Sequence, residues 1–480
     1  MMATEMAPLA KVGGLADVVG ALAPALARAG HDVRVLLPRY ASIDAARHGL
    51  TSADGAARAE IGSGKNKVLV DLLESAEHFG RPGIYNDPKD GTGYPDNAER
   101  FIWFQQAALA RLKKLNFRPD VIHCHDHQTA LVPAYLRLHM AADPFFEGVG
   151  TLLTIHNLGY QGLFPPEVLE KAGFDRSLFY PAGPFEFWGK VNFMKVGLSF
   201  ADVITTVSPT YAREIREPEQ GCGLEGVLES RREDLFGVLN GIDDSYWNPS
   251  KDTHLLDHYD VKSVTGKGKC KTRLLEALEV PVSRRRVPVI GIISRLTEQK
   301  GFDLIEQALP ELMSRDLKLV ALGSGEPRYV TMLQSARERH PDKVGLRIGF
   351  DESLAHLIEA GSDMFLMPSL YEPCGLNQMY SLAYGTVPIV RATGGLADTV
   401  NEDGEQPNGF VFRPYEAGAM MAAVDRALSR FADRVAWGKV MKAGMRGDYG
   451  WTKSAATYAD LYARAAQGAG RRVGTTARTA

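Results

Sequence analysis

The chain has 480 residues, of which 45% are hydrophobic and 24% charged, a composition typical of globular proteins with more than one domain. Its 55 Lys and Arg against 58 Asp and Glu give a net charge of −3, which excludes a global attraction to nucleic acid or to an anionic membrane surface. The four cysteines contain no Cys-x-x-Cys pair, which indicates a reducing cytoplasm and argues against a disulfide framework or a zinc site.

The first distinctive stretch is KVGGLADVV over 11–19, an amphipathic pattern that begins at two glycines. Gly13 and Gly14 place pliable backbone and N–H groups at a helix start, where the helix dipole favours an anion such as phosphate. The alternative is a plain tight turn between a strand and a helix. Only MMATEMAPLA precedes these residues, so we predict that the first strand of the sheet is truncated or absent.

Short β-branched runs alternate with helical patterns in two series. The first comprises 31–38, 66–73, 120–125, 151–156, 202–207 and 235–240, with an amphipathic helix predicted over 99–115. The second comprises 287–294, 317–323, 345–350, 362–368, 386–391 and 409–412, and Pro310 is expected to kink or break a helix within it. This alternation predicts parallel sheets covered on both faces.

The two series predict an α/β fold of two Rossmann-like, doubly wound domains, with a ligand cleft between them at the carboxyl ends of both sheets. We expect the domains over 1–245 and 246–450, because the stretch after residue 240 is rich in Asn, Asp and Pro. A helix over 451–466 is expected to return to the first domain, followed by a flexible tail over 467–480. Neither a membrane span nor a signal peptide is visible, so the cytoplasm is the expected location.

Candidate chemical groups follow the strands of the second domain. SRLTEQKG over 294–301 supplies Arg295 and Lys300, which could stabilise charge on a departing phosphate or could be plain surface cations. Glu372 follows a predicted buried strand, where a carboxylate needs partners such as sugar hydroxyls. Cys374 is a candidate reactive thiol, although a buried structural cysteine is the commoner case. GGLAD recurs at 394–398, and this repetition favours anion binding over a simple turn.

Two motifs of the first domain, HCHDHQT over 123–129 and TIHNLGYQG over 154–162, each end a strand. They bring to one rim His123, His125, Asp126, His127 and His156. Three alternate histidines resemble a metal site, but a helix beginning near residue 126 would take them off a common face. We therefore interpret these groups as hydrogen-bond partners for a polyol and predict no metal site.

In order and spacing, several motifs resemble those of the bacterial glycogen synthases and plant starch synthases, over about residues 5–465. They are KVGGLADVVGALAPAL, HCHDHQT, TIHNLGYQG, NGID…WNP, ISRLTEQKG, LYEPCGLNQMYSLAYGTVPIV and TGGLADTV. The resemblance implies the GT-B architecture and transfer of glucose from ADP-glucose to the non-reducing 4-hydroxyl of an α-1,4-glucan. It further implies retention of configuration and the use of no metal or other cofactor. No nucleic-acid or membrane partner is expected.

The same resemblance assigns roles to individual residues. It implies that Glu372 is the carboxylate essential for transfer, that Arg295 and Lys300 hold the diphosphate, and that Asp126 and His156 surround the transferred sugar and the acceptor. Lys11 would contact the donor, with Gly13 and Gly14 beside its phosphates. The other implied substrate-binding residues are Asn240, Cys374, Gly375, Leu376, Thr393, Gly394 and Gly395.

The predicted mechanism is a front-face displacement, in which the phosphate leaves and the acceptor hydroxyl attacks an oxocarbenium-like centre from the same side. A double displacement through Glu372 or Asp126 is the alternative route. One rival function is a catalytically impaired glucan-binding protein of the same fold, which would have lost donor-phosphate residues. The other is a sugar-nucleotide epimerase or a phosphorylase, and no pyridoxal-lysine motif of the latter is found.

Overall fold

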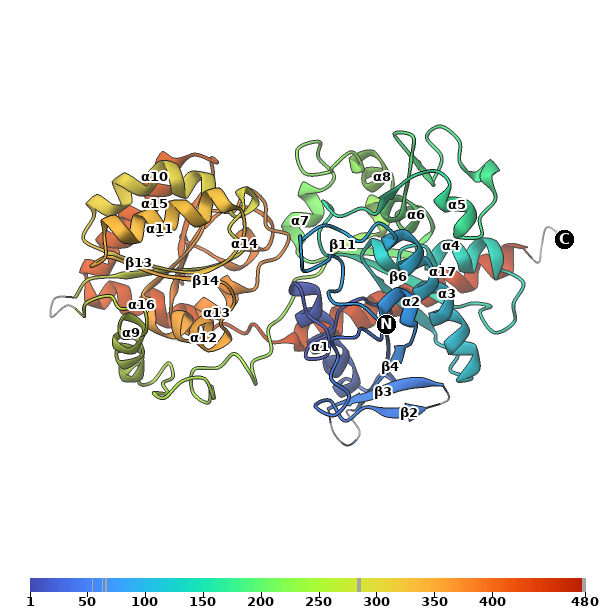
Figure 1. The fold of residues 1–480 in the computed structure, drawn as a ribbon, viewed down its shortest axis with the longest axis horizontal. Coiled ribbons are helices and arrows are strands. Elements are labelled where there is room, and N and C mark those ends of the chain that lie inside the picture. Colours follow the sequence, from blue (N-terminus) through green and yellow to red (C-terminus); the bar gives the residue numbers. More distant parts are fainter. Residues whose placement is uncertain (54, 63, 65–66, 283–285, 477–480) are drawn as a thin grey trace. The chain divides into compact units, whose positions relative to one another are not determined.

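The computed structural model describes residues 1–53, 55–62, 64, 67–282 and 286–476, and its internal contacts separate two units (Figure 1). Unit 1 comprises Met1–Gly241 and Trp451–Ala480, and unit 2 comprises Ile242–Gly450. The first boundary therefore follows residue 241, whereas the sequence analysis predicts it after residue 245. The second boundary follows residue 450, as predicted. Each unit contains its own sheet. That of unit 2 is parallel throughout, and that of unit 1 is parallel except at one edge, where Ala56–Ile61 pairs antiparallel with Thr51–Ala53 and Val68–Leu73, in contrast to the predicted all-parallel sheet.

The sheet of unit 1 has two halves, ordered β2-β3-β4-β1 and β5-β6-β10-β11. Met2 lies between them, with parallel bridges to Leu36 of β1 and to Cys124 of β5. The segment around Met2 therefore occupies the central position of the sheet, and the chain leaves this position toward Glu5. The strands are β1 (Arg34–Pro38), β2 (Thr51–Ala53), β3 (Ala56–Ile61), β4 (Val68–Leu73), β5 (Val121–His125), β6 (Gly150–Ile155), β10 (Val203–Thr206) and β11 (Leu235–Gly237).

Helices α1 (Gly14–Arg28) and α17 (Trp451–Thr476) pack on this sheet, and α3 (Asn97–Lys114) forms where the sequence predicts a helix. Val18 and Leu22 of α1 share a core cluster with Leu152 of β6 and Tyr458 of α17. A Cβ on Gly150 would come within 2.7 Å of the Ala465 backbone, so only glycine lets α17 lie this close to β6. Helix α17 continues to Thr476, past the expected end at 466, and 477–480 lie outside the described residues.

Unit 2 has a six-stranded parallel sheet in the order β14-β13-β12-β15-β16-β17. In order of sequence this is the arrangement 3-2-1-4-5-6 of doubly wound nucleotide-binding folds, in which the strand order reverses between the parallel strands β12 and β15. Each predicted strand of the second series is confirmed. They are β12 (Val289–Ile293), β13 (Lys318–Gly323), β14 (Val344–Ile348), β15 (Met364–Met367), β16 (Val387–Arg391) and β17 (Phe410–Phe412).

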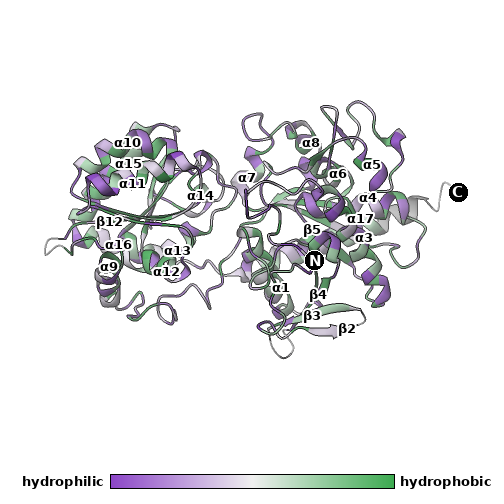
Figure 2. Cartoon of the chain, viewed as in Figure 1, coloured by the Kyte–Doolittle hydropathy of each residue, from purple (hydrophilic) through white to green (hydrophobic). Residues whose placement is uncertain are grey.

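The helices of unit 2 cover both faces of this sheet, and hydrophobic residues concentrate in the strands and in the helix faces turned toward them (Figure 2). They include α9 (Thr265–Ala277), α10 (Phe302–Ser314), α11 (Pro327–Arg339), α12 (Glu352–Gly361), α13 (Asn377–Ala383), α14 (Gly394–Thr399), α15 (Ala417–Ala432) and α16 (Arg434–Met445). The predicted break at Pro310 is wrong, because α10 continues through it. Pro310 is exposed, so water can form a hydrogen bond with the carbonyl that lacks its helical partner because proline has no N–H.

A small antiparallel sheet in unit 1, not predicted from the sequence, has the order β7-β9-β8 and consists of β7 (Leu163–Phe164), β8 (Glu186–Phe187) and β9 (Lys190–Asn192). Within the described ranges of the chain, no helix combines the length and the apolar character that crossing a bilayer requires.

Candidate active site

The loop after β12 lies directly against the loop after β15, at the point where the strand order of the unit 2 sheet reverses. After β12 the chain passes through the 3-10 turn η6 (Glu298–Lys300) into α10. Leu370 donates its backbone N–H to the carbonyl of Gln299 at 2.9 Å. Gly301 has a φ of 79°, and a Cβ there would clash with the carbonyl of Pro368. The two loops can therefore approach this closely only with glycine at 301.

Lys300 and Glu372 form an ion pair across these loops. Lys300 Nζ lies 2.6 Å from Glu372 Oε2, and the Ser369 hydroxyl donates to the same oxygen at 3.1 Å. The side chain of Glu372 is 7% exposed and that of Lys300 is 21% exposed. A carboxylate so deeply buried needs a cation or several hydrogen-bond donors. The structure thus joins two residues that the sequence analysis took from separate motifs.

Arg295 belongs to the same loop as Lys300 but faces solvent. Its side chain is exposed, and Nη2 donates to Oε1 of Gln299 at 3.1 Å. A guanidinium is a planar group that suits binding of carboxylate and phosphate oxygens.

The second Gly-Gly pair packs against the backbone of the Glu372 loop. A Cβ on Gly394 would clash with the carbonyl of Glu372, and one on Gly395 with the carbonyl of Cys374. The N–H of Gly395 points at the carbonyls of Glu372 and Pro373, at 3.3 and 3.2 Å. This amide therefore holds the Glu372 loop in place, and the predicted approach of the segment to the donor phosphates stays a prediction.

The other predicted residues of unit 2 surround the same loop. Cys374 is buried, at 4% exposure, and its carbonyl accepts a hydrogen bond from Gln378 Nε2 at 3.0 Å. Gly375 has a φ of 73°, a left-handed conformation that favours glycine, and its carbonyl accepts from the same nitrogen. Leu376 immediately precedes α13, and Thr393, also buried, precedes α14. The environment of Cys374 matches a structural thiol.

In unit 1, the KVGGL loop is fixed by a residue that the sequence analysis did not single out. Glu5 is 3% exposed, and its Oε2 accepts the N–H groups of Val12 and Gly13 at 2.5 and 2.8 Å. Gly14 begins α1, and Lys11 forms an exposed ion pair with Asp17 at 2.7 Å. The amide of Gly13 is therefore directed at a carboxylate of the protein itself, and the predicted place of Gly13 and Gly14 beside the donor phosphates stays a prediction.

Asp126 and His156 meet at the ends of β5 and β6. Asp126 Oδ1 accepts the backbone N–H of His156 at 2.7 Å, and Asp126 has a φ of 57°, an uncommon conformation for a residue other than glycine. Burial raises the pKa of Asp126 to about 7, although the backbone N–H groups of His156 and Asn157 oppose the shift. Burial lowers the pKa of the His156 imidazole to about 3. Near neutral pH the site thus holds a neutral imidazole and a carboxyl close to its titration midpoint.

The remaining histidines at these strand ends form hydrogen bonds with other groups of the protein. His125 Nδ1 lies 2.9 Å from His156 Nε2, His123 Nε2 lies 2.6 Å from Thr154 Oγ1, and His127 Nδ1 lies 3.1 Å from the carbonyl of Tyr160. In the described part of the chain, no three His, Cys, Asp or Glu side chains are grouped in a way that could hold a metal ion.

Two further residues have exposed or unpaired groups at these strand ends. Asn240 follows β11 and is 6% exposed, and its Oδ1 has no hydrogen-bond partner among the described residues. Phe350 follows β14 and is 83% exposed, so one aromatic face is open beside the carboxyl edge of the sheet of unit 2. The sequence analysis missed Phe350 because it placed this residue at the end of the strand predicted over 345–350, whereas β14 ends at Ile348.

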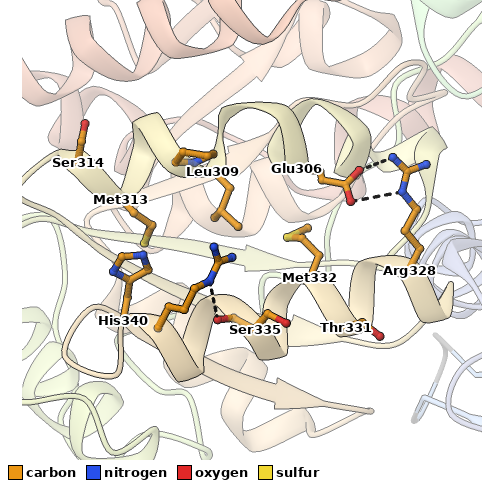
Figure 3. Close-up of a pocket in the computed structure, with 11 residues that line it drawn as sticks. Glu306, Leu309, Met313, Ser314, Arg328, Thr331, Met332, Ser335 and His340 are labelled. Carbon is orange, nitrogen blue, oxygen red and sulfur yellow. Dashed lines mark hydrogen bonds and ion pairs between the residues drawn. The ribbon is translucent and has the colours of Figure 1, made fainter.

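A cavity of about 660 Å³ in unit 2 lies away from all of these residues, between α10 and α11 (Figure 3). Leu309, Met313 and Met332 line it, and Glu306 and Arg328 form an ion pair at its edge. None of the predicted site residues contributes to its lining.

Comparison with known proteins matches the two halves of the chain to two family models. Residues 1–230 match the starch synthase catalytic domain, and residues 277–442 match the glycosyl transferases group 1 model. A glycogen synthase of Syntrophotalea carbinolica is 45% identical over 97% of this chain and 98% of its own length. One of Geotalea uraniireducens is 47% identical over 98% of this chain and 99% of its own length.

Solved structures give the same picture. The catalytic domain of starch synthase IV from Arabidopsis thaliana, bound to ADP and acarbose, has a TM-score of 0.86 and 34% identity, covering 97% of this chain and 98% of that one. A sucrose-phosphate synthase of Thermosynechococcus elongatus, at 19% identity and a TM-score of 0.61, covers 96% of this chain and 97% of that one and shares the fold alone.

Proposed function

The chain belongs to the glycogen synthase and starch synthase family of GT-B-fold glycosyltransferases, and we propose that it transfers glucose from ADP-glucose to the non-reducing 4-hydroxyl of an α-1,4-glucan with retention. The observation that carries this proposal is the buried Lys300–Glu372 pair beside the exposed Arg295. It combines cations for a leaving diphosphate with a carboxylate for a sugar. The impaired alternative receives no support, since Lys11, Arg295, Lys300 and Glu372 are all present.

On the donor side, the leaving group requires positive charge. As the glycosidic bond breaks, negative charge grows on the β-phosphate, and Arg295 and Lys300 would stabilise it in the transition state. Lys300 and Ser369 both contact Oε2 of Glu372, so Oε1 is the oxygen offered to a hydroxyl of the glucose. The exposed ring of Phe350 offers a stacking face for the base of the nucleotide.

On the acceptor side, Asp126 and His156 would bind the transferred sugar and the incoming hydroxyl. Because its imidazole stays neutral near pH 7, His156 can donate or accept a hydrogen bond without adding charge. Asp126, whose pKa is about 7, can accept a hydrogen bond from a sugar hydroxyl or hold a proton. The departing diphosphate itself would take the proton of the attacking hydroxyl, as front-face displacement requires.

We further propose that the transfer needs no metal ion or other cofactor and that it takes place in the cytoplasm. The first statement is supported by two cationic side chains on one loop, which could neutralise a diphosphate. The second is supported by the match to bacterial glycogen synthases.

One assay tests the proposal. The full chain is incubated with ADP-glucose or UDP-glucose, with and without glycogen, and nucleoside diphosphate release is measured, with Glu372→Gln as the inactive control. We expect ADP release that depends on glycogen, a preference for ADP-glucose, and no effect of EDTA. No release in any tube would contradict the synthase proposal, and release only without glycogen would indicate hydrolysis. NMR of the first product reports the anomeric configuration.

A further inference from the structure

The glycine-rich loop of unit 1 is anchored from inside by one carboxylate. Glu5 Oε2 accepts the adjacent amides of Val12 and Gly13, while Oε1 accepts the hydroxyl of Tyr85 at 2.7 Å. On its outer side the loop meets little protein, since Val12 is 62% exposed and a Cβ on Gly13 would find no atom within 4 Å. The backbone bridge between Met6 and Ala10 holds the start of this loop, and the contacts to Glu5 hold Val12 and Gly13.

The surroundings of Glu5 are themselves rigid. The Tyr85 hydroxyl also lies 2.8 Å from Thr4 Oγ1, and Tyr40 donates its hydroxyl to the carbonyl of Thr4 at 3.0 Å. Burial raises the pKa of Tyr85 well above its ordinary value, so this hydroxyl remains a neutral donor. Hydrogen bonds from amides to an ionised carboxylate are roughly twice as strong as those between neutral groups.

We propose that Glu5 is a positioning residue for glucosyl transfer: by holding the amides of Val12 and Gly13, it fixes the loop that presents Lys11 and the start of α1 to the donor. The inference rests on the proposed function, in which Lys11 contacts the nucleotide sugar. Glu5 itself is buried beneath the loop and acts through it.

Glu5 also acts on Asp126 through its charge. Burial is the main cause that raises the pKa of Asp126, the N–H groups of His156 and Asn157 lower it, and the negative charge of Glu5 raises it further. The imidazoles near Asp126 add no positive charge near neutral pH. Burial lowers the pKa of His127 to about 4, that of His156 to about 3 and that of His125 well below its usual value. Neutralising Glu5 should therefore lower the pKa of Asp126.

Three substitutions separate the reach of the side chain from its charge. Glu5→Gln keeps the reach and loses the charge, Glu5→Asp keeps the charge but is one methylene too short, and Glu5→Ala loses both. Tyr85→Phe is the matched control, because it removes a contact to Oε1 and leaves the two amide contacts to Oε2 intact. All four are made in the full chain and compared by unfolding midpoint, KM for ADP-glucose, KM for glycogen, pH profile and amide hydrogen exchange.

We expect the KM for ADP-glucose to rise about tenfold in Glu5→Ala and Glu5→Asp, the effect of losing one charge-assisted hydrogen bond, with the KM for glycogen unchanged. The acidic limb of the pH profile should move to lower pH in Glu5→Gln and Glu5→Ala but not in Glu5→Asp or Tyr85→Phe. The amides of Val12 and Gly13 should exchange faster in Glu5→Ala and Glu5→Asp only.

The outcomes distinguish this inference from the proposed function. Wild-type exchange of the two amides in Glu5→Ala, or equal increases in both KM values, would overturn the positioning role. If the wild-type chain releases no ADP from ADP-glucose, the proposed function fails, and the exchange rates still decide whether Glu5 anchors the loop.

Discussion

Replacing Lys300 by methionine should destabilise unit 2 and abolish transfer, because it removes the counter-charge of Glu372. At 2.6 Å and an effective dielectric constant of about 20, the attraction between two unit charges is about 6 kcal/mol. Burial of Glu372, whose side chain is 7% exposed, offsets part of this, so removing one partner should cost about 3 kcal/mol. For a unit of this size, that corresponds to a fall in Tm of roughly 6–12 °C.

The double variant Lys300→Met with Glu372→Gln separates stability from chemistry. A neutral amide at position 372 can still accept the Ser369 hydroxyl and needs no cation, so most of the lost stability should return, to within about 1 kcal/mol. Transfer should stay abolished in both variants. Calorimetry of the full chain measures the unfolding transitions, and ADP release measures the activity. A double variant as unstable as Lys300→Met would refute the reasoning, because it would show that the two charges are not coupled.

Three further predictions concern glycine, arginine and aspartate. Gly395→Ala should lower the unfolding free energy by more than about 2 kcal/mol, because its Cβ would clash with the carbonyl of Cys374. Gly13→Ala is the control and should leave the Tm unchanged, because Gly13 has a φ of −140° and no atom would lie within 4 Å of its Cβ. Arg295→Ala should reduce kcat about 100-fold while the Tm stays within about 2 °C of wild type, since the side chain is exposed; a large fall in Tm would show a structural role. Asp126→Asn should flatten the pH dependence of stability. Because the pKa of Asp126 is about 7 in the folded chain and 3.8 in the unfolded chain, the wild type loses stability as the pH rises from about 4 to about 7. Melting curves across this range should show no such loss of stability from position 126 in the variant.

Much of the fold could be predicted because its strands carry the hydrophobic, β-branched runs that buried parallel strands require. The runs at 287–294 and 362–368 contain β12 and β15. The reversal of strand order places these two parallel strands side by side, so the loops that follow them meet. The hairpin β2–β3 was not predicted, since Thr51–Ala53 and Ala56–Ile61 are dominated by alanine and polar residues. The segment around Met2 takes strand position through pairing with its neighbours, which a local pattern does not encode.

Prediction of the site succeeded where strand ends determine it. Lys300 and Glu372 come from loops after two adjacent strands, so their convergence follows from topology. The partners of the glycine amides could not be predicted, because sequence periodicity says nothing about which side chain or carbonyl turns toward a loop N–H. The side chain of Glu5 accepts the amide of Gly13, which lies eight residues later in the chain. The Gly395 amide points at the carbonyls of Glu372 and Pro373, which belong to the loop after another strand.

The repeated GGLAD sequence shares one packing feature in the two units. In each copy a glycine amide is directed at a glutamate loop of the same unit: Gly13 at the carboxylate of Glu5, and Gly395 at the carbonyl of Glu372. In the proposed function, Arg295 and Lys300 on one loop would balance the charge of the donor. Such a local positive charge would allow a chain of net charge −3 to bind an anionic substrate, while the amides of Gly13 and Gly395 hold the segments of Glu5 and Glu372 in place.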